Sequence, residues 1–211
     1  MTDTSSLTTL VYLPLISGLI LLATPENILS RLPGFKPSFH WFFGLAISFS
    51  VLAQALGFMT QFPAHIAGMQ FATVAERLTA IGLNGSLGMD GISLWLIVLT
   101  ALITPVMLIA SANKMPKRTR EFVALILVIE GGALGAFLTA DLLLFFVFWQ
   151  LVLIPTFYLI RLGEGDESRQ ASATFGFYTG LGSVLMLIGI VSLQNTAGSF
   201  SFSEVLKVEL S

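Results

Sequence analysis

The sequence predicts an all-α polytopic membrane protein with about six transmembrane helices. Of its 211 residues, 55% are hydrophobic and only 10% are charged, and the mean hydropathy is +0.88. A soluble domain of this length carries about 25% charged residues. The 19 glycines agree with this class, because glycine is commoner in membrane helices than in soluble ones.

Long apolar stretches define the individual spans. A helix needs about 20 mostly apolar residues to cross a bilayer. Segments rich in polar residues, proline and glycine, such as RLPGFKP, NKMPKR and LGEGDESRQ, separate these stretches and mark turns. The predicted spans are 7–24, 39–60, 91–113, 121–139, 142–161 and 171–194.

The chain is expected to have three parts. Residues 1–90 would form two transmembrane helices plus an extracytoplasmic loop, residues 91–194 four transmembrane helices, and residues 195–211 an extracytoplasmic tail. The loop of 61–90 contains QFPAHIAG and LNGSLG, which predict a short amphipathic or hairpin element outside the bilayer.

The positions of the basic residues predict the orientation. Cytoplasmic loops of membrane proteins collect lysine and arginine. The segments on the same side of the membrane as the termini hold only two basic residues, Arg77 and Lys207, whereas the loops on the other side hold eight. Both termini are therefore predicted to be extracytoplasmic, in a bacterial inner membrane or a thylakoid. The loops after the first, third and fifth spans hold Arg31, Lys36, Lys114, Lys117, Arg118, Arg120, Arg161 and Arg169.

Several classes of site are not expected. The absence of cysteine excludes disulfides, thiolate metal sites and cysteine-held iron–sulfur clusters. His40 and His65 are isolated, so a metal site is not predicted. A net charge of −2 without a long basic run gives no support to nucleic-acid binding. A cleaved signal peptide is not predicted either, because the first basic residue is Arg31 and Asp3 precedes the first apolar stretch.

Glu130 and Gln150 are polar residues predicted to lie at the middle of the membrane. An ionisable residue inside a span costs about 2.5–3.5 kcal/mol on insertion scales, and Glu130 is the clear case here. Each of the two lies about ten residues from the turn at Thr139–Asp141. At about 1.5 Å per residue this is about 15 Å, half of the roughly 30 Å hydrocarbon core.

Two interpretations of these polar residues remain open. Glu130 and Gln150 could form a structural hydrogen bond, worth about 0.6 kcal/mol by membrane averages. They could instead belong to a proton path, which Tyr178 on the sixth span would extend.

Other residues are expected to be structural. Asp141 follows Thr139 and is predicted to be the N-cap of the fifth span. Gly131 and Gly135, like Gly176 and Gly180, form GxxxG pairs that allow close helix contact.

Pro105 and Pro155 lie inside the third and fifth spans. They remove the hydrogen bonds to the carbonyls of Ala101 and Leu151. Such kinks can hydrate a passage, although membrane helices also tolerate proline without any function.

Three segments resemble the antiporter-like membrane subunits of respiratory complex I. They are LGMDGISLWLIVLT (87–100), EGGALGAFLTADLLLFFVFWQLVLIPTFYLI (130–160) and ASATFGFYTG (171–180). The type they resemble is chain M or subunit 4, including cyanobacterial and plastid relatives, and the resemblance covers roughly residues 85–206.

The resemblance implies an antiporter-like fold of about fourteen spans, with two inverted repeats of five and a role in proton transport. In that family a glutamate directly follows the tryptophan of span five and pairs with a lysine on a broken seventh span. A further lysine usually precedes the F-x-x-Y-T stretch of span six. Here Gln150 stands at the glutamate position and Thr174 at the lysine position. The chain ends at Ser211, before the expected seventh span and its pairing lysine. Glu130 remains as the one carboxyl at the middle of the membrane and is the candidate replacement for the family glutamate.

The implied function is that of a membrane-arm subunit, or its N-terminal piece, in a complex I-type NAD(P)H or ferredoxin:quinone oxidoreductase. Quinone, flavin and iron–sulfur clusters would then belong to partner subunits, and no cofactor is expected on this chain. The expected partners are other membrane-arm subunits and lipid. Alternatives are a subunit of a multisubunit cation/proton antiporter or membrane-bound hydrogenase, a non-conducting paralogue acting as a scaffold or assembly factor, and a fragment of a longer gene.

Overall fold

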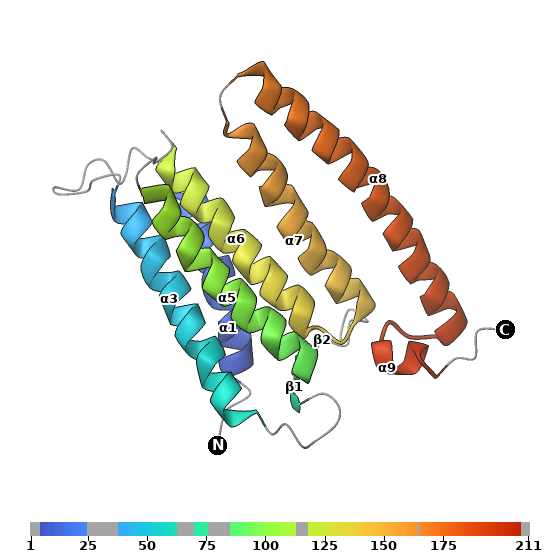
Figure 1. Ribbon diagram of the computed structural model, residues 1–211. Helices are drawn as coiled ribbons and strands as arrows, with labels where there is room; N and C mark the ends of the chain where they lie inside the picture. Colours follow the sequence, from blue (N-terminus) through green and yellow to red (C-terminus); the bar gives the residue numbers. More distant parts are fainter. Residues whose placement is uncertain are drawn as a thin grey trace.

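A computed structural model describes residues 5–24, 38–62, 70–75, 85–112, 118–163 and 165–207. Apolar helices make up most of the described chain, and a two-stranded hairpin lies at one end of the bundle (Figure 1). The elements are α1 (Ser5–Ala23), α3 (Ser38–Gln61), β1 (Gln70–Ala75), β2 (Gly85–Met89), α5 (Gly91–Ser111), α6 (Thr119–Leu138), α7 (Leu142–Arg161), α8 (Asp166–Ala197) and α9 (Phe202–Val205).

The prediction of an all-α polytopic membrane protein is confirmed. Among the described helices, α3, α5, α6, α7 and α8 are each long and apolar enough to cross a membrane. Helix α1 contributes a shorter apolar stretch, Leu7–Ala23. The predicted limits hold to within a few residues for all of these except α8.

Helix α8 is longer than predicted. It begins at Asp166 rather than at residue 171, and it continues to Ala197, giving 32 residues. At about 1.5 Å per residue it is about 48 Å long, well beyond the roughly 30 Å hydrocarbon core. The predicted span was shorter than the helix because hydropathy detects only the apolar part of a helix, whereas backbone hydrogen bonding continues into polar residues.

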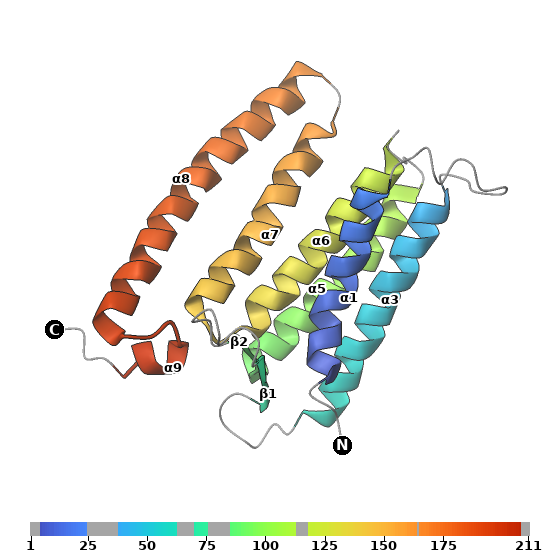
Figure 2. The same ribbon diagram turned by 180° about the vertical axis from the view of Figure 1, so that it is seen from behind.

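Helix α6 is the central element of the bundle. It packs against α1, α3, α5 and α7, and 67% of its most apolar stretch is buried, against 11% for α7 and for α8. Helices α7 and α8 stand to one side of the group formed by α1, α3, α5 and α6 (Figure 2). A polar residue on α6 is therefore enclosed by protein, whereas α7 and α8 leave much of their surface free.

Glycines bring the backbones of α1 and α6 close together. A Cβ added at Gly18 would lie 2.7 Å from the carbonyl oxygen of Ala124, and one added at Gly131 would lie 2.5 Å from Cγ of Leu15. Lipid tails are as apolar as leucine, so helix association in a bilayer depends on this kind of close van der Waals contact.

The sequence predicted either a short amphipathic element or a hairpin for the loop of 61–90, and the structure contains the hairpin. Strands β1 and β2 pair antiparallel, with Gln70 opposite Met89 and Ala75 opposite Gly85. Leu87 and Met89 are buried and join the hydrophobic core. The hairpin therefore covers one end of the bundle.

The turn between α6 and α7 pairs through its backbone with the hairpin on one side and with the C-terminal tail on the other. Thr139 forms an isolated bridge with Leu87 of β2, and Asp141 forms one with Ser201 of the tail. The backbone N–H of Leu142 donates to the carbonyl of Phe200, and that of Phe202 donates to the carbonyl of Ala140, both at 3.0 Å. Hairpin, turn and tail are thus joined at this end of the bundle.

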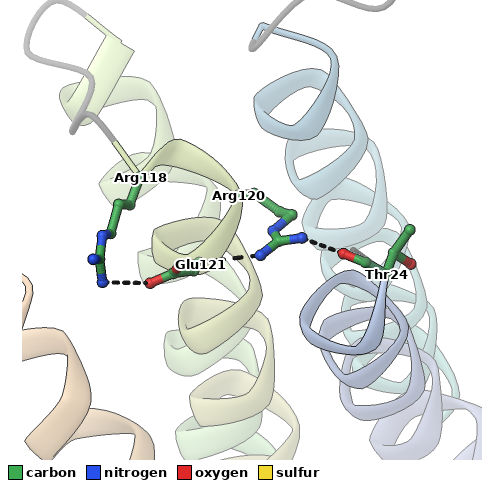
Figure 3. Close-up of polar contacts among 4 residues, drawn as sticks. All are labelled: Thr24, Arg118, Arg120 and Glu121. Carbon is green, nitrogen blue, oxygen red and sulfur yellow. Dashed lines mark hydrogen bonds and ion pairs between the residues drawn. The ribbon is translucent and has the colours of Figure 1, made fainter. Parts of the chain in front are cut away.

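A cluster of charged side chains lies at the opposite end (Figure 3). Arg118 contacts Glu121 at 3.3 Å, and Arg120 contacts the other carboxylate oxygen of Glu121 at 4.0 Å. Arg120 also donates to the carbonyl of Thr24, just past the end of α1. A cation is favourable there because a helix C-terminus carries partial negative charge.

The described basic residues are divided unevenly between the two ends. Arg161, where α7 ends, and Arg169, near the start of α8, share the end that carries Arg118 and Arg120 (Figure 1). Lys207 follows α9 at the other end. The remaining residues of the charge argument, Arg31, Lys36, Arg77, Lys114 and Lys117, lie outside the described residues, as does His65.

Candidate functional site

Glu130 is a buried carboxyl near the middle of α6. Its residue is only 1% exposed, and α6 runs from Thr119 to Leu138. Neither carboxylate oxygen has a hydrogen-bond partner among the described residues. Buried polar groups nearly always have a partner, so an exception of this kind calls for an explanation.

Thr104 of α5 is the polar side chain that interacts with Glu130. It is 5% exposed, and its hydroxyl donates to the carbonyl of Thr100 at 3.1 Å. The hydroxyl proton is therefore already used within α5, and no hydrogen bond of acceptable geometry reaches the carboxyl.

A hydrogen bond between Glu130 and Gln150, the first of the two interpretations left open by the sequence, is not formed among the described residues. Helix α6 meets α7 through Gly132, where an added Cβ would lie 3.1 Å from the backbone of Leu151. Glu130 comes two residues earlier, which turns it by about 200° around the helix. It therefore faces away from α7, although it lies at about the same depth as Gln150.

Gln150 instead pairs with α8. Its side-chain oxygen accepts a hydrogen bond from the hydroxyl of Ser183 at 3.0 Å. Ser183 is 6% exposed, whereas Gln150 is partly exposed. The pair is neutral, and it joins α7 to α8 near the middle of α7.

Ser183 was missed by sequence reasoning, although a signal was present. The buried residues of α8 are Ser172, Ser183 and Ile190. Separations of eleven and seven residues are close to whole numbers of helical turns, so these positions share one face. The two serines could have marked that face as the one against α7.

Thr174 and Tyr178 lie on another face of α8. Tyr178 is 69% exposed, and Thr174 is exposed as well. Thr174 is nine residues from Ser183, which is about 180° around the helix. Tyr178 therefore lies on a different side of α8 from the hydrogen bond between Gln150 and Ser183. Thr174 lines a shallow surface hollow formed by α8 itself, with Glu167, Gln170, Ala171 and Phe175.

Asp141 is the N-cap of α7. Its Oδ1 accepts hydrogen bonds from the backbone N–H groups of Leu143 and Leu144, both at 2.9 Å, and its residue is 2% exposed. The hydroxyl of Thr139 in turn accepts from the N–H of Asp141 at 3.2 Å. Asp141 thereby satisfies helix-end donors that would otherwise be buried without partners.

Asp90 performs the same role for α5 and was not singled out from the sequence. Its carboxylate accepts from the backbone N–H of Ser93 at 2.7 Å. This hydrogen bond holds the pKa of Asp90 below its ordinary value. The signal was an aspartate shortly before an apolar stretch, where an N-cap residue is expected.

The glycine pairs differ from the expected pattern. Gly131 contacts α1, whereas Gly135 packs against the ring of Phe148 on α7, so the two serve different helices. In the second pair, an added Cβ at Gly176 would lie 3.1 Å from the ring of Phe157, but one at Gly180 would meet nothing within 4 Å.

Pro105 and Pro155 are both buried within their helices. Pro105 lies directly after Thr104, next to the interaction with Glu130. Among the described residues, no group of three or more His, Asp or Glu side chains comes together as a metal site would require.

Two family models together match most of the chain. The model described as NADH-ubiquinone oxidoreductase chain 4, amino terminus, matches residues 35–131. The model described as NADH:quinone oxidoreductase/Mrp antiporter, TM, matches residues 139–210. The F(420)H(2) dehydrogenase subunit M of Methanosarcina mazei is 34% identical over 155 residues, which cover 74% of this chain and 31% of that protein. The chain belongs to the family of antiporter-like membrane subunits of complex I.

Further members of this family match over nearly the whole of this chain. The NAD(P)H-quinone oxidoreductase chain 4 1 of Picosynechococcus sp. is 33% identical over 198 residues, covering 93% of this chain and 35% of that protein. The respiratory complex I structure from Thermus thermophilus with bound NADH contains a chain that matches with a TM-score of 0.78 and 26% identity. That match covers 97% of this chain and 40% of the other. The chain thus spans about a third of the length of the curated relatives it matches.

Proposed function

We propose that this chain is a membrane-arm subunit, or the N-terminal part of one, in a complex I-type assembly, and that it takes part in proton translocation coupled to quinone reduction. Membership of the antiporter-like family supports this role. The electron donor would be NAD(P)H or ferredoxin, and flavin, iron–sulfur clusters and quinone would be bound by partner subunits. The chain itself would supply part of a proton path and no redox centre.

The observation that carries the proposal is the burial of Glu130. An ionisable side chain at this depth costs about 2.5–3.5 kcal/mol on insertion scales. Glu130 forms no hydrogen bond that would offset this cost among the described residues. A carboxyl that only stabilised the bundle would be expected to have partners. We therefore assign Glu130 the role of taking up and releasing a proton inside the membrane.

Gln150 has a different role in this proposal. An amide has no charged form with which to carry a proton between water and the membrane interior. Its hydrogen bond to Ser183 holds α7 against α8. Proton movement would therefore depend on the side of α6 that faces α5, and Thr174 and Tyr178 would lie outside it.

The proposed orientation follows from the division of charge. The end that carries Arg118, Arg120, Arg161 and Arg169 would face the cytoplasm or its equivalent. The start of α1 and the end of the described chain lie at the opposite end (Figures 1 and 2), which would be extracytoplasmic.

Purification from native membranes in mild detergent tests the proposed assembly. We expect the chain to migrate with a large complex that oxidises NAD(P)H or reduced ferredoxin. Migration alone would refute the membrane-arm role, and co-purification with a cation/proton antiporter would favour the Mrp-like alternative.

Substitution within that complex tests the role of Glu130. The variant Glu130→Gln should lower the number of protons moved per quinone reduced while leaving the complex assembled. The control is Glu121→Gln, which removes a carboxylate at the charged end of α6 and should leave the proton count unchanged.

A non-conducting scaffold is the second candidate, and Gln150 is the observation that favours it. A neutral amide bonded to Ser183 stands where the resemblance implies a charged glutamate. If the chain is only a scaffold, Glu130→Gln will leave the proton count at its original value. Substitution of Ser183 should then weaken assembly without changing proton movement per quinone.

A further inference from the structure

Helix α8 forms one outer edge of the described structure (Figures 1 and 2). It packs mainly against α7, through the face that carries Ser172, Ser183 and Ile190. Only 11% of its most apolar stretch is buried. The side of α8 that points away from α7 therefore lies open among the described residues.

A continuous strip of large side chains runs along this open side. Its members follow one another at intervals of three or four residues, which keeps them on one face of the helix. This outer strip consists of Tyr178, Leu181, Leu185 and Ile188, with exposed fractions of 69%, 54%, 63% and 57%. Contacts between membrane helices are enriched in small residues that let the backbones approach. A strip of large side chains is better suited to contact with lipid chains.

The outer strip leads to a polar hollow at the level of the lipid headgroups. Ser183 is hydrogen-bonded to Gln150 near the middle of α7 and marks the middle of the membrane. Thr174 is nine residues nearer the start of α8. At about 1.5 Å per residue this is about 14 Å, close to the edge of the roughly 30 Å hydrocarbon core. By the same count Gln170 and Glu167 lie about 20 and 24 Å from the middle, among the headgroups. The hollow is lined by Glu167, Gln170, Ala171, Thr174 and Phe175.

The polar groups of the hollow match a headgroup that carries both an amine and a phosphate. Glu167 supplies a carboxylate, whereas Gln170 and Thr174 supply an amide N–H₂ and a hydroxyl that donate hydrogen bonds. The five lining residues carry one negative charge and no positive charge. Arg169 is about 140° around the helix from Thr174, and it contacts Asp166 at 3.5 Å. An anionic headgroup would therefore meet a carboxylate with no cation beside it.

We propose that the hollow and the outer strip bind one phospholipid with a primary amine in its headgroup, phosphatidylethanolamine. The ammonium would contact the carboxylate of Glu167, the phosphate would accept hydrogen bonds from Gln170 and Thr174, and one acyl chain would lie along the outer strip. A primary ammonium has three N–H donors, as lysine does, whereas the quaternary ammonium of phosphatidylcholine has none. The site shares no residue with the proposed proton path and does not depend on the proposed function.

Photolabelling tests whether lipid occupies this surface. The chain, kept in the complex with which it purifies, is placed in phosphatidylcholine vesicles that contain a trace of phosphatidylethanolamine with a photoreactive acyl chain. Peptide mass spectrometry should find the label on Tyr178, Leu181 or Leu185. If the outer strip stays unlabelled while other apolar helices are labelled, a protein segment covers this face and the proposal is overturned.

A series of headgroups tests the recognition without any change to the protein. Unlabelled phosphatidylethanolamine, its N-methyl and N,N-dimethyl derivatives, phosphatidylcholine and phosphatidylglycerol each compete with the photoreactive lipid. Because exposed ion pairs are weak, we expect phosphatidylethanolamine to compete about twofold to fivefold better than phosphatidylcholine, with the methylated forms in between. Phosphatidylglycerol should compete least well, because it is a net anion. Equal competition by all five lipids, or the strongest competition by phosphatidylglycerol, would overturn the site.

Two variants and a control assign the headgroup to the hollow. Glu167→Ala should remove the preference for phosphatidylethanolamine over phosphatidylcholine, and Thr174→Val should weaken labelling of the outer strip by about threefold. The control is Glu204→Ala, which removes an exposed carboxylate just past the other end of α8. It should leave the preference unchanged. A preference that survives in Glu167→Ala at its original value would contradict the proposed recognition.

Discussion

A methyl group at Gly131 should separate α1 from α6. The new Cβ of Gly131→Ala would lie 2.5 Å from Cγ of Leu15 and 2.9 Å from the carbonyl oxygen of Val11. Ordinary contacts lie at about 3.5–4.0 Å, so α1 would have to shift by about an ångström at its closest contact. Overpacking of this kind costs about 1–3 kcal/mol, which exceeds the gain of up to about 1 kcal/mol from replacing glycine by alanine in a helix.

Gly180→Ala is the matched control. It also lies inside a long helix, but its added Cβ would meet nothing within 4 Å. It should therefore leave the free energy of unfolding unchanged or raise it by up to about 1 kcal/mol. The two variants should differ by about 1–3 kcal/mol in unfolding followed by circular dichroism in mixed detergent. If Gly131→Ala proves as stable as Gly180→Ala, the close contact between α1 and α6 does not exist as described.

Three further variants test the polar contacts. Ser183→Ala removes the donor to Gln150 and should lower the free energy of unfolding by about 0.6 kcal/mol, with Ser192→Ala, on an exposed part of α8, expected to have no effect in the same assay. Asp141→Ala removes a cap that accepts two backbone hydrogen bonds and should cost about 1–2 kcal/mol at pH 7, seen as a lower midpoint of detergent unfolding. Asp90→Ala should cost about 0.5–2 kcal/mol at pH 7. Because the pKa of Asp90 is lowered in the folded chain, its contribution is present above the ordinary carboxyl pKa and is lost as the pH falls through the lowered value. Wild type and Asp90→Ala should therefore converge in stability in acid, and a constant difference down to the most acidic pH would contradict the assignment.

Depth in the membrane could be predicted from the sequence, because it depends on counting residues along one helix. The spans, the cap at Asp141 and the central level of Glu130 all follow from such local rules. The added turn at the start of α8 did not, since a polar helical turn has no hydropathy signal.

The partner of each polar residue could not be predicted, because it depends on which helix packs on which face. Glu130 and Gln150 lie at similar depths, yet the contact of Gly132 with Leu151 turns the carboxyl away from α7. Nothing local to either residue indicates that α5 and α8 take these two faces.

The bonds around the turn between α6 and α7 have a mechanical consequence. Residues 200–202 are bonded to residues 140–142, so α7 and α8 are linked both by the short connection after Arg161 and by the tail at the opposite end. Because α7 and α8 are linked at both ends, we expect them to move together as one unit and to resist separation. A displacement of the tail would reach the first residues of α7 before it reached the middle of α8. On α6, the ring of Phe148 packs into the space at Gly135 and the backbone of Leu151 packs against Gly132, so the position of α7 and α8 along α6 is fixed by these two contacts.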